Sequence, residues 1–386
     1  MEYNNYCMKR IVDYFLGTSL LICSIACGDR NGNRPVKSTP ITFEPYRQEV
    51  FLEDIADDFY YLPLGSTNHF FIRNVNRLFL TDSTIIVADF SQKAVFVFDQ
   101  HGVAKTKINR YGQGPGEYPQ MTDVLFDEEN GWIEVFSPQV KKVFSYDQEG
   151  GLVKEKKILD GKRSGLRFAK HKDFYVFDRC CYPRDKNRMG IFYSDGSDIK
   201  FINSYLAIPP AITGIGYCGG NTLDTNRDSL YFLPTLGDTI YSVSKEGVNA
   251  AYHLDVPKEN QIPRTLFQEK AFKNFDEYSV QIDSKWVSDP TWLLVNDKYI
   301  YLNYSYSSSM ISLFYSKRSG KVKQMTLYKS RLNPEQRLLH VMKAKKADYF
   351  VTTIHPTQYV NLPKKIRNKL NDKSNPVLLL FKLKDF

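Results

Sequence analysis

Four polar side chains in one glycine-rich segment are the first candidates for ligand chemistry. Arg110, Gln113, Glu117 and Tyr118 lie in residues 109–118, which also hold three glycines and a proline. Glycine and proline allow the backbone to turn tightly there. We predict that these side chains present donors and acceptors to a ligand. The alternative is a structural role, in which Glu117 caps loop amides and Tyr118 packs beneath the loop.

A second set of candidates lies farther along the chain. Tyr217 and Asn221 belong to a glycine-rich segment, and Tyr304 and Tyr306 alternate with serines. The glycine-rich segment, residues 214–221, lacks the Lys-Ser/Thr ending of a phosphate-binding loop. We predict that these four residues line a site for a glycan or a peptide, with tight-turn and core roles as the alternatives.

Motifs typical of enzymes are missing from the sequence. It has no HExxH zinc motif, no CxxC pair and no GxSxG nucleophile elbow. This absence favours a binding protein over an enzyme. An alternative is a lyase or a metal-assisted hydrolase built from residues far apart in the chain.

We expect no cofactor, with calcium as the alternative. Calcium binds carboxylate and amide oxygens, and the conceivable ligands here are Asp123, Asn221, Asp224 and Asn303. The net charge is +9, from 52 Lys and Arg against 43 Asp and Glu. Basic clusters such as residues 154–157 and 364–367 are dispersed along the chain. We therefore expect solvated faces and no nucleic-acid partner.

The N-terminal segment predicts export and a lipid anchor. Residues 11–26 follow a basic stretch, are mostly apolar and end at Ser24-Ile25-Ala26-Cys27, which is similar to a bacterial lipobox. This segment is too short to span a bilayer comfortably and fits a signal peptide. We predict a signal peptide over residues 1–26, acylation of Cys27 and a lipid-anchored linker over residues 27–45. The expected location is the cell envelope, as an outer-membrane lipoprotein facing the periplasm or the cell surface.

Three cysteines follow the predicted anchor. Cys180 and Cys181 are adjacent, and adjacent cysteines rarely pair with each other because disulfide geometry opposes it. Either of them could pair with Cys218. Simple core roles for all three are the alternative.

Short apolar strands recur with a period near 48 residues. Each unit combines short strands with a marker glycine, and the markers are Gly102, Gly150, Gly196, Gly247 and Gly320. A period of 40–50 residues made of short strands is typical of a β-propeller. Continuous apolar runs suit blades that are buried on both faces.

We predict an all-β fold, a six-bladed β-propeller over residues 46–386. Residues 376–383 have the pattern of a third strand in the last blade, and the chain stops before a fourth. Residues 58–64 can supply that strand and close the ring, which removes a free sheet edge. Short helical insertions are expected at residues 257–290 and 363–370.

The string Gly-Gln-Gly-Pro-Gly-Glu-Tyr at residues 112–118 resembles a family. It is similar to the six-bladed β-propeller lipoproteins of Bacteroidetes, which are related to NHL-repeat propellers. The strand Phe59-Tyr60-Tyr61-Leu62-Pro63-Leu64 also resembles that family, and the resemblance covers residues 51–386. It implies a propeller fold and an envelope location but no activity.

The expected function is therefore that of an exported, lipid-anchored binding module. Its partners would be the membrane, through the anchor, and a small molecule, glycan, peptide or envelope protein at the central-channel face. The alternatives are the lyase or metal-assisted hydrolase above and an envelope scaffold that docks other proteins.

Overall fold

Antiparallel strands fill most of the residues that the computed structural model describes. These are residues 38–67, 69–159, 165–180, 186–269, 271–330, 333–338 and 344–386. The predicted signal peptide, Cys27 and Cys181 lie outside the described residues. Within these ranges, every helix is too short to cross a membrane.

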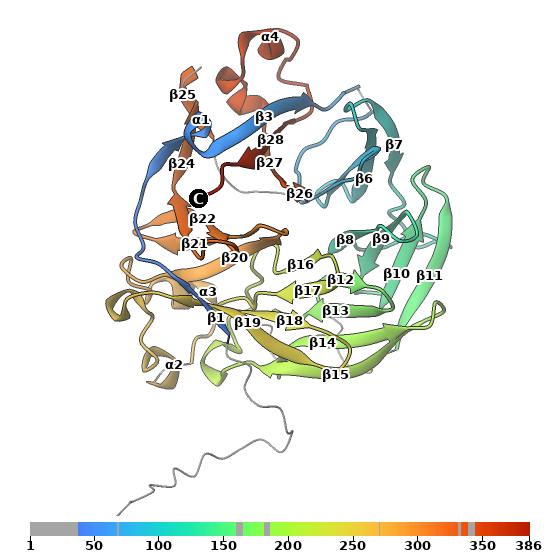
Figure 1. The fold of residues 1–386 in the computed structure, drawn as a ribbon. Helices are drawn as coiled ribbons and strands as arrows, with labels where there is room; N and C mark the ends of the chain where they lie inside the picture. Colours follow the sequence, from blue (N-terminus) through green and yellow to red (C-terminus); the bar gives the residue numbers. More distant parts are fainter. Residues whose placement is uncertain are drawn as a thin grey trace, which may run out of the picture. The chain divides into compact units, whose positions relative to one another are not determined.

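Twenty-four of the described strands form six antiparallel meanders of four strands each (Figure 1). Two of these meanders, within residues 123–159 and 167–207, are joined by a parallel pair into one eight-stranded sheet. Neighbouring strands pair in the order in which they are listed here: β4 (Arg77–Leu80), β5 (Thr84–Asp89), β6 (Ala94–Asp99), β7 (Ala104–Ile108); β8 (Asp123–Asp127), β9 (Trp132–Ser137), β10 (Lys142–Tyr146), β11 (Leu152–Leu159); β12 (Arg167–His171), β13 (Phe174–Asp178), β14 (Asn187–Ser194), β15 (Ile199–Ala207); β16 (Leu223–Asn226), β17 (Ser229–Phe232), β18 (Thr239–Val243), β19 (Val248–Asp255); β20 (Ser288–Val295), β21 (Tyr299–Tyr306), β22 (Ser309–Ser316), β23 (Val322–Met325); and β26 (Ala344–Lys346), β27 (Tyr349–Ile354), β28 (Val377–Leu383), β3 (Ala56–Pro63).

The meanders are arranged as in a propeller. The first strand of each contacts the first strand of a neighbour, as β4 does with both β8 and β26. Apolar clusters join neighbouring meanders, so Val97 and Phe144 share one cluster while Phe136 and Phe177 share the next. All of β5 is buried because it has a neighbouring meander on each face. The predicted all-β propeller is confirmed.

The N-terminal strand completes the last meander, as predicted. β3 pairs antiparallel with β28, and Tyr61 lies opposite Leu379. The marker glycine Gly102 has a φ of +81°, and a Cβ there would lie 2.3 Å from the carbonyl oxygen of Pro63. Only glycine fits this position without strain, because the turn before β7 touches the end of the closing strand.

The residues just before β3 also join the sheets. β1 (Thr39–Thr42) pairs in parallel with β19, and β2 (Glu49–Phe51) pairs with β24 (Leu327–Ser330), which pairs in turn with β25 (Asn333–Leu338). A short helix, α1 (Leu52–Ile55), leads into β3. Residues 39–42 fall inside the predicted linker, so part of the predicted linker forms a strand that pairs with the propeller.

The helical insertions are shorter than their sequence pattern indicates. Residues 256–287 hold η2 (Lys258–Asn260), α2 (Leu266–Glu269) and α3 (Phe275–Ser279). The other predicted insertion, residues 363–370, contains α4 (Lys364–Arg367), and η3 (Pro356–Asn361) lies just before it. Phe272 and Tyr278 pack against Ile208 and Ile212, beside η1 (Pro210–Ile212). This contact fixes the first insertion to the connection between β15 and β16.

Candidate functional site

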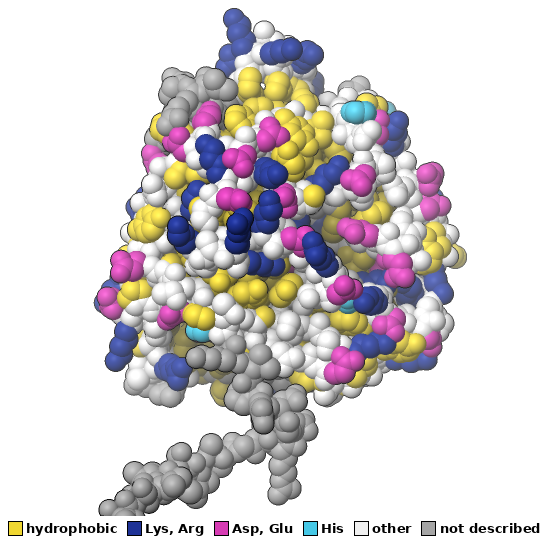
Figure 2. All heavy atoms as spheres, in the orientation of Figure 1, with side chains coloured by type: hydrophobic (Ala, Val, Ile, Leu, Met, Phe, Trp, Pro, Cys, Tyr) yellow, Lys and Arg dark blue, Asp and Glu magenta, His cyan; other side chains and the backbone are white. Residues whose placement is uncertain are grey.

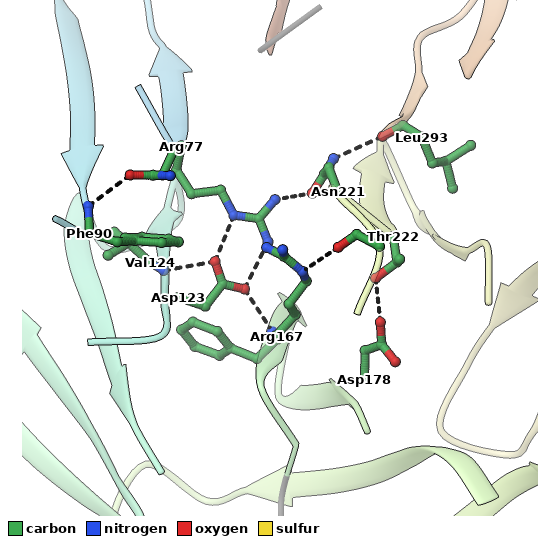
Figure 3. A network of polar contacts seen from close by, with 12 residues as sticks. Arg77, Phe90, Asp123, Val124, Arg167, Asp178, Asn221, Thr222 and Leu293 are labelled. Atoms are coloured by element: carbon green, nitrogen blue, oxygen red, sulfur yellow. Dashed lines mark hydrogen bonds and ion pairs between the residues drawn. The ribbon is translucent and has the colours of Figure 1, made fainter. Parts of the chain in front are cut away.

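Polar side chains converge where the first strands of several meanders begin. Arg77 is the first residue of β4, Asp123 of β8 and Arg167 of β12. Asn221 lies just before β16, and Figure 3 shows these four side chains directed toward one another. We call this region, together with the adjacent Tyr217, the channel mouth.

Arg77 and Asp123 form the fixed part of the channel mouth. Arg77 donates from Nε to Asp123 Oδ1 at 2.6 Å and from Nη2 to Asp123 Oδ2 at 2.8 Å. Its Nη1 donates to Asn221 Oδ1. Asp123 also accepts from the backbone N–H of Phe168 at 2.9 Å. One guanidinium thus links three meanders, and the buried carboxylate of Asp123 is fully used.

A second set of hydrogen bonds surrounds Asp178 at the end of β13. Its Oδ2 accepts from Thr222 Oγ1 at 2.6 Å, and its Oδ1 accepts from the Cys180 N–H at 2.7 Å. Burial raises the pKa of Asp178. Asn221 donates to the carbonyl oxygen of Leu293 at 2.9 Å. These contacts hold the connection before β16 against the third and fifth meanders.

Arg167 differs from Arg77 because both of its Nη groups lack a hydrogen-bond acceptor among the described residues. Its Nε donates to the carbonyl oxygen of Gly219 at 3.2 Å. The side chain is partly exposed. Burial lowers the pKa of Arg167, and the charge of Arg77 adds to this. A guanidinium presents its donors as a planar fork that matches a carboxylate.

Tyr217 places a second free donor next to Arg167. Its ring stacks on Phe275 of α3 with 4.0 Å between the centroids. Its hydroxyl has no hydrogen-bond partner in the described part of the chain. Burial raises the pKa of Tyr217, Asp289 raises it further, and Arg167 opposes them. The phenol therefore lies within electrostatic reach of both side chains.

A disulfide holds this part of the channel mouth. It joins Cys180 to Cys218, with 5.0 Å between the Cα atoms. Of the two pairings left open by the sequence, the structure has the one with Cys180. Because Cys218 lies between Tyr217 and Gly219, the bridge positions both the free phenol and the carbonyl that orients Arg167.

Asp289 lies in strand β20 beside the channel mouth. Burial raises its pKa to about 6. Its Oδ1 is buried and has no hydrogen-bond partner among the described residues. Asp289 also lines a cleft of about 710 Å³, together with Arg188 of β14, Tyr241 of β18 and residues of the first insertion such as Phe267. Its backbone φ of +49° is unusual for a residue other than glycine.

Ion pairs also surround a cavity that Arg77 and Asn221 line. Lys170 pairs with Asp127, and Lys345 pairs with Asp224, around this cavity of about 410 Å³. Two predicted calcium ligands, Asp123 and Asp224, are therefore engaged by cations. Calcium stays a prediction.

The other potential metal ligands are also engaged. Asn221 accepts from Arg77, while Asn303 accepts from Tyr301 and Ser312 within the β21–β22 pair. One cluster of potential metal ligands, Asp178 with Cys180 and Cys218, occurs in the described ranges. Both of its sulfurs belong to the disulfide.

The first predicted loop lies apart from the channel mouth. Arg110 donates to the carbonyl oxygen of Gly150 at 3.2 Å, and Gln113 is exposed. Glu117 accepts from the Gly114 N–H at 2.9 Å. The fully buried Tyr118 donates its hydroxyl to the carbonyl oxygen of Lys93 at 2.8 Å. Glu117 caps the loop and Tyr118 packs beneath it, so these two follow the structural alternative.

Tyr304 and Tyr306 also lie away from the channel mouth. Tyr304 is 1% exposed, donates to Gln324 and packs on Phe43 at 5.3 Å between centroids. Its burial differs from the expected role in a surface site, because residue 43 of the N-terminal segment covers it. Tyr306 is partly buried against the same cluster. Of the predicted ligand residues, the structure therefore brings together Tyr217 and Asn221.

Four residues of this region were not among those predicted from the sequence: Arg77, Arg167, Asp178 and Asp289. Arg77, Asp123 and Arg167 are 46 and 44 residues apart, close to the spacing of the marker glycines. A charged residue at an equivalent position of three successive repeats was the signal that could have found them.

The fold and the channel mouth define an all-β propeller protein with unsaturated donors at one end of its channel. The chain belongs to the family described as Domain of unknown function (DUF4934), whose model matches residues 41–382. No curated protein matches the chain.

Two solved structures share the fold. A Bacteroides fragilis protein described as exported has 16% identity and a TM-score of 0.72, over 90% of this chain and 100% of that one. A member of the DUF4221 family from Bacteroides vulgatus has 11% identity and a TM-score of 0.51, over 85% of this chain and 97% of that one.

Proposed function

We propose that this protein is an exported binding module whose channel mouth binds a carboxylate group of a glycan or a peptide. Arg167 is the main anchor, and Tyr217 adds a hydroxyl donor. In this proposal each meander is one blade of a six-bladed propeller, and acylated Cys27 holds the protein at the outer membrane.

One observation carries the proposal. Among the converging side chains of the channel mouth, Arg77, Asp123 and Asn221 use their polar groups on one another, whereas Arg167 keeps both Nη groups free. A partly buried guanidinium whose two Nη groups lack an acceptor favours binding an anionic group, because a charged hydrogen bond contributes about 1.5–3 kcal/mol.

Export and anchoring rest on separate support. The lipobox-like string before Cys27 favours both, and the similar Bacteroides fragilis protein is described as exported. Labelled fatty acid should be incorporated into the wild-type protein and not into Cys27→Ala. Equal labelling of both would contradict the anchor and leave the binding proposal untouched.

Paired ligands test the binding proposal. The melting temperature of the purified protein would be compared between oligogalacturonate and neutral oligogalactose. It would also be compared between a peptide with a free C-terminal carboxylate and the same peptide with a C-terminal amide. A ligand at about 100 times its Kd stabilises by roughly 2.7 kcal/mol, which a thermal-shift assay detects. We expect a shift with an acidic member and a smaller one with its neutral partner. Equal shifts within both pairs, or none, would contradict the proposal.

An acid–base enzyme is the second candidate, because of Asp289. Its pKa of about 6 suits proton transfer near neutral pH, and it lines the large cleft. Turnover of an acidic glycan that disappears in Asp289→Asn would favour this function. Binding without turnover would favour the module.

A docking scaffold is the third candidate, and the second insertion supports it. Exposed Lys364, Lys365, Lys369 and Lys373 lie in and after α4. Figure 2 shows Lys and Arg side chains gathered over this helix, while the rest of the visible face mixes both signs of charge. Pull-down of an acidic envelope protein that is lost on replacing these lysines would favour a scaffold.

A further inference from the structure

A cavity of about 560 Å³ lies between the first two meanders, apart from the channel mouth. Its wall includes His69 and Arg73 from the connection before β4, Lys107 at the end of β7, and Arg110. Glu149 is the carboxylate among the lining residues. Protein sites for small organic ligands are typically about 300–1,000 Å³. The size and the three permanent cations therefore suit a small anionic ligand.

The cations of this cavity are not neutralised by the protein. Lys107 Nζ lies 3.4 Å from the carbonyl oxygen of His69, and Arg110 Nη2 lies 3.2 Å from that of Gly150. Arg73, Lys107 and Arg110 form no ion pair with any described carboxylate. Lys105, two residues before Lys107, does pair with Asp99 at 3.4 Å.

Asp89 could have paired with these cations but is saturated by neutral donors. Its Oδ2 accepts from the backbone N–H groups of Arg73 at 2.8 Å and Asn74 at 3.0 Å. The side chain of Gln92 donates to the same oxygen at 2.8 Å and to the carbonyl oxygen of Phe71 at 2.7 Å. These bonds fix the cavity wall and leave the Arg73 guanidinium available.

We propose that this rim cavity binds a phosphate or sulfate group carried by a small organic molecule such as a sugar. Arg73 and Arg110 offer forked donors and Lys107 a point charge, a combination that suits a tetrahedral oxyanion. This site is distinct from the proposed carboxylate site at Arg167.

Calorimetric titration of the purified protein tests the proposal. The probes are inorganic phosphate, inorganic sulfate and glucose 6-phosphate, each at two salt concentrations. We expect all three to bind, with the sugar ester tightest and every affinity falling at higher salt. The double variant Arg73→Gln with Lys107→Gln should lower the affinity about tenfold or more.

Matched variants make the result specific. Lys105→Gln removes a paired cation from the same strand and should bind like the wild type. Arg167→Gln should also keep phosphate binding, so failure of the carboxylate proposal and failure of this one are distinguishable. Wild-type affinity in a folded double variant, or no binding of any probe at millimolar concentration, would overturn the proposal.

Discussion

The second and third meanders meet at two polar sites of different character. In the interior, Glu134 accepts from Lys156 Nζ at 2.6 Å and from the Tyr175 hydroxyl, and all three side chains are almost fully buried. At the channel mouth, Arg167 keeps two donor groups free. Saturated charges between blades join the sheets to one another, whereas unsaturated donors at the edge are available for a ligand.

The largest effect on stability is expected in the buried cluster of Glu134, Lys156 and Tyr175. Glu134→Gln should lower the free energy of unfolding by about 3–5 kcal/mol, because it leaves Lys156 buried without its carboxylate. Urea unfolding measures the change. Asp195→Asn, which breaks an exposed pair with Lys200, should have no measurable effect. Equal losses in the two variants would remove the distinction between the cluster and the surface.

The disulfide tests what holds the channel mouth in place. Cys180 and Cys218 are 38 residues apart. Replacing both by serine should lower the free energy of unfolding by about 4 kcal/mol, because the unfolded chain regains the entropy of an open loop. The same variant should weaken ligand binding, since Tyr217 and Gly219 lose their anchor. Full binding in a variant of reduced stability would show that the bridge serves only the fold.

Asp289 should make stability depend on pH in an unusual direction. Its folded-state pKa is about 6, above the ordinary value of 3.8. Between pH 4 and pH 6 the Asp289 carboxyl therefore binds more protons in the folded state than in the unfolded state, and its contribution to stability falls as pH rises. Asp289→Asn should remove this slope and stabilise the protein at pH 7 by up to about 3 kcal/mol.

Unfolding at pH 4, 5, 6 and 7 measures this effect. Asp283→Asn, at a solvent-exposed carboxylate in the insertion just before β20, should keep the wild-type slope. An unchanged slope in Asp289→Asn would show that this carboxyl does not titrate in that range.

The smallest effect on stability is expected at Arg167. Arg167→Gln removes one bond to Gly219 and should cost about 1 kcal/mol or less. A loss of unfolding free energy as large as that in Glu134→Gln would mean that Arg167 is a fully paired charge with a structural role.

The repeats allowed the fold to be predicted, because each blade is local in sequence. The strands around Gly102 and Gly150, and the closing strand before Leu64, were expected from apolar runs and turn residues. The parallel pairing of β1 with β19 was not, since it joins residues more than 200 positions apart and has no turn signal.

The site was harder to predict than the fold, because its polar contacts cross between meanders. Lys156 belongs to a basic cluster that was expected to be solvated, yet it is 4% exposed and paired with Glu134. Asp123 was considered as a calcium ligand, but its partner Arg77 lies in another blade. The residue types along one strand do not show which charged side chain of a neighbouring meander will lie beside them.

Titration of oligogalacturonate and of a free-carboxylate peptide tests the central claim most directly. Wild-type protein, Arg167→Gln, Arg167→Lys and a control would be compared by calorimetry at one ionic strength. The control is Arg227→Gln, which replaces an exposed arginine that follows β16 and pairs with Asp297. We expect the wild type and Arg227→Gln to bind at least one of these probes equally. Arg167→Gln should bind it about tenfold more weakly or worse, with Arg167→Lys in between because it keeps the charge without the fork. Wild-type affinity in Arg167→Gln, or no binding by the wild type, would contradict the claim.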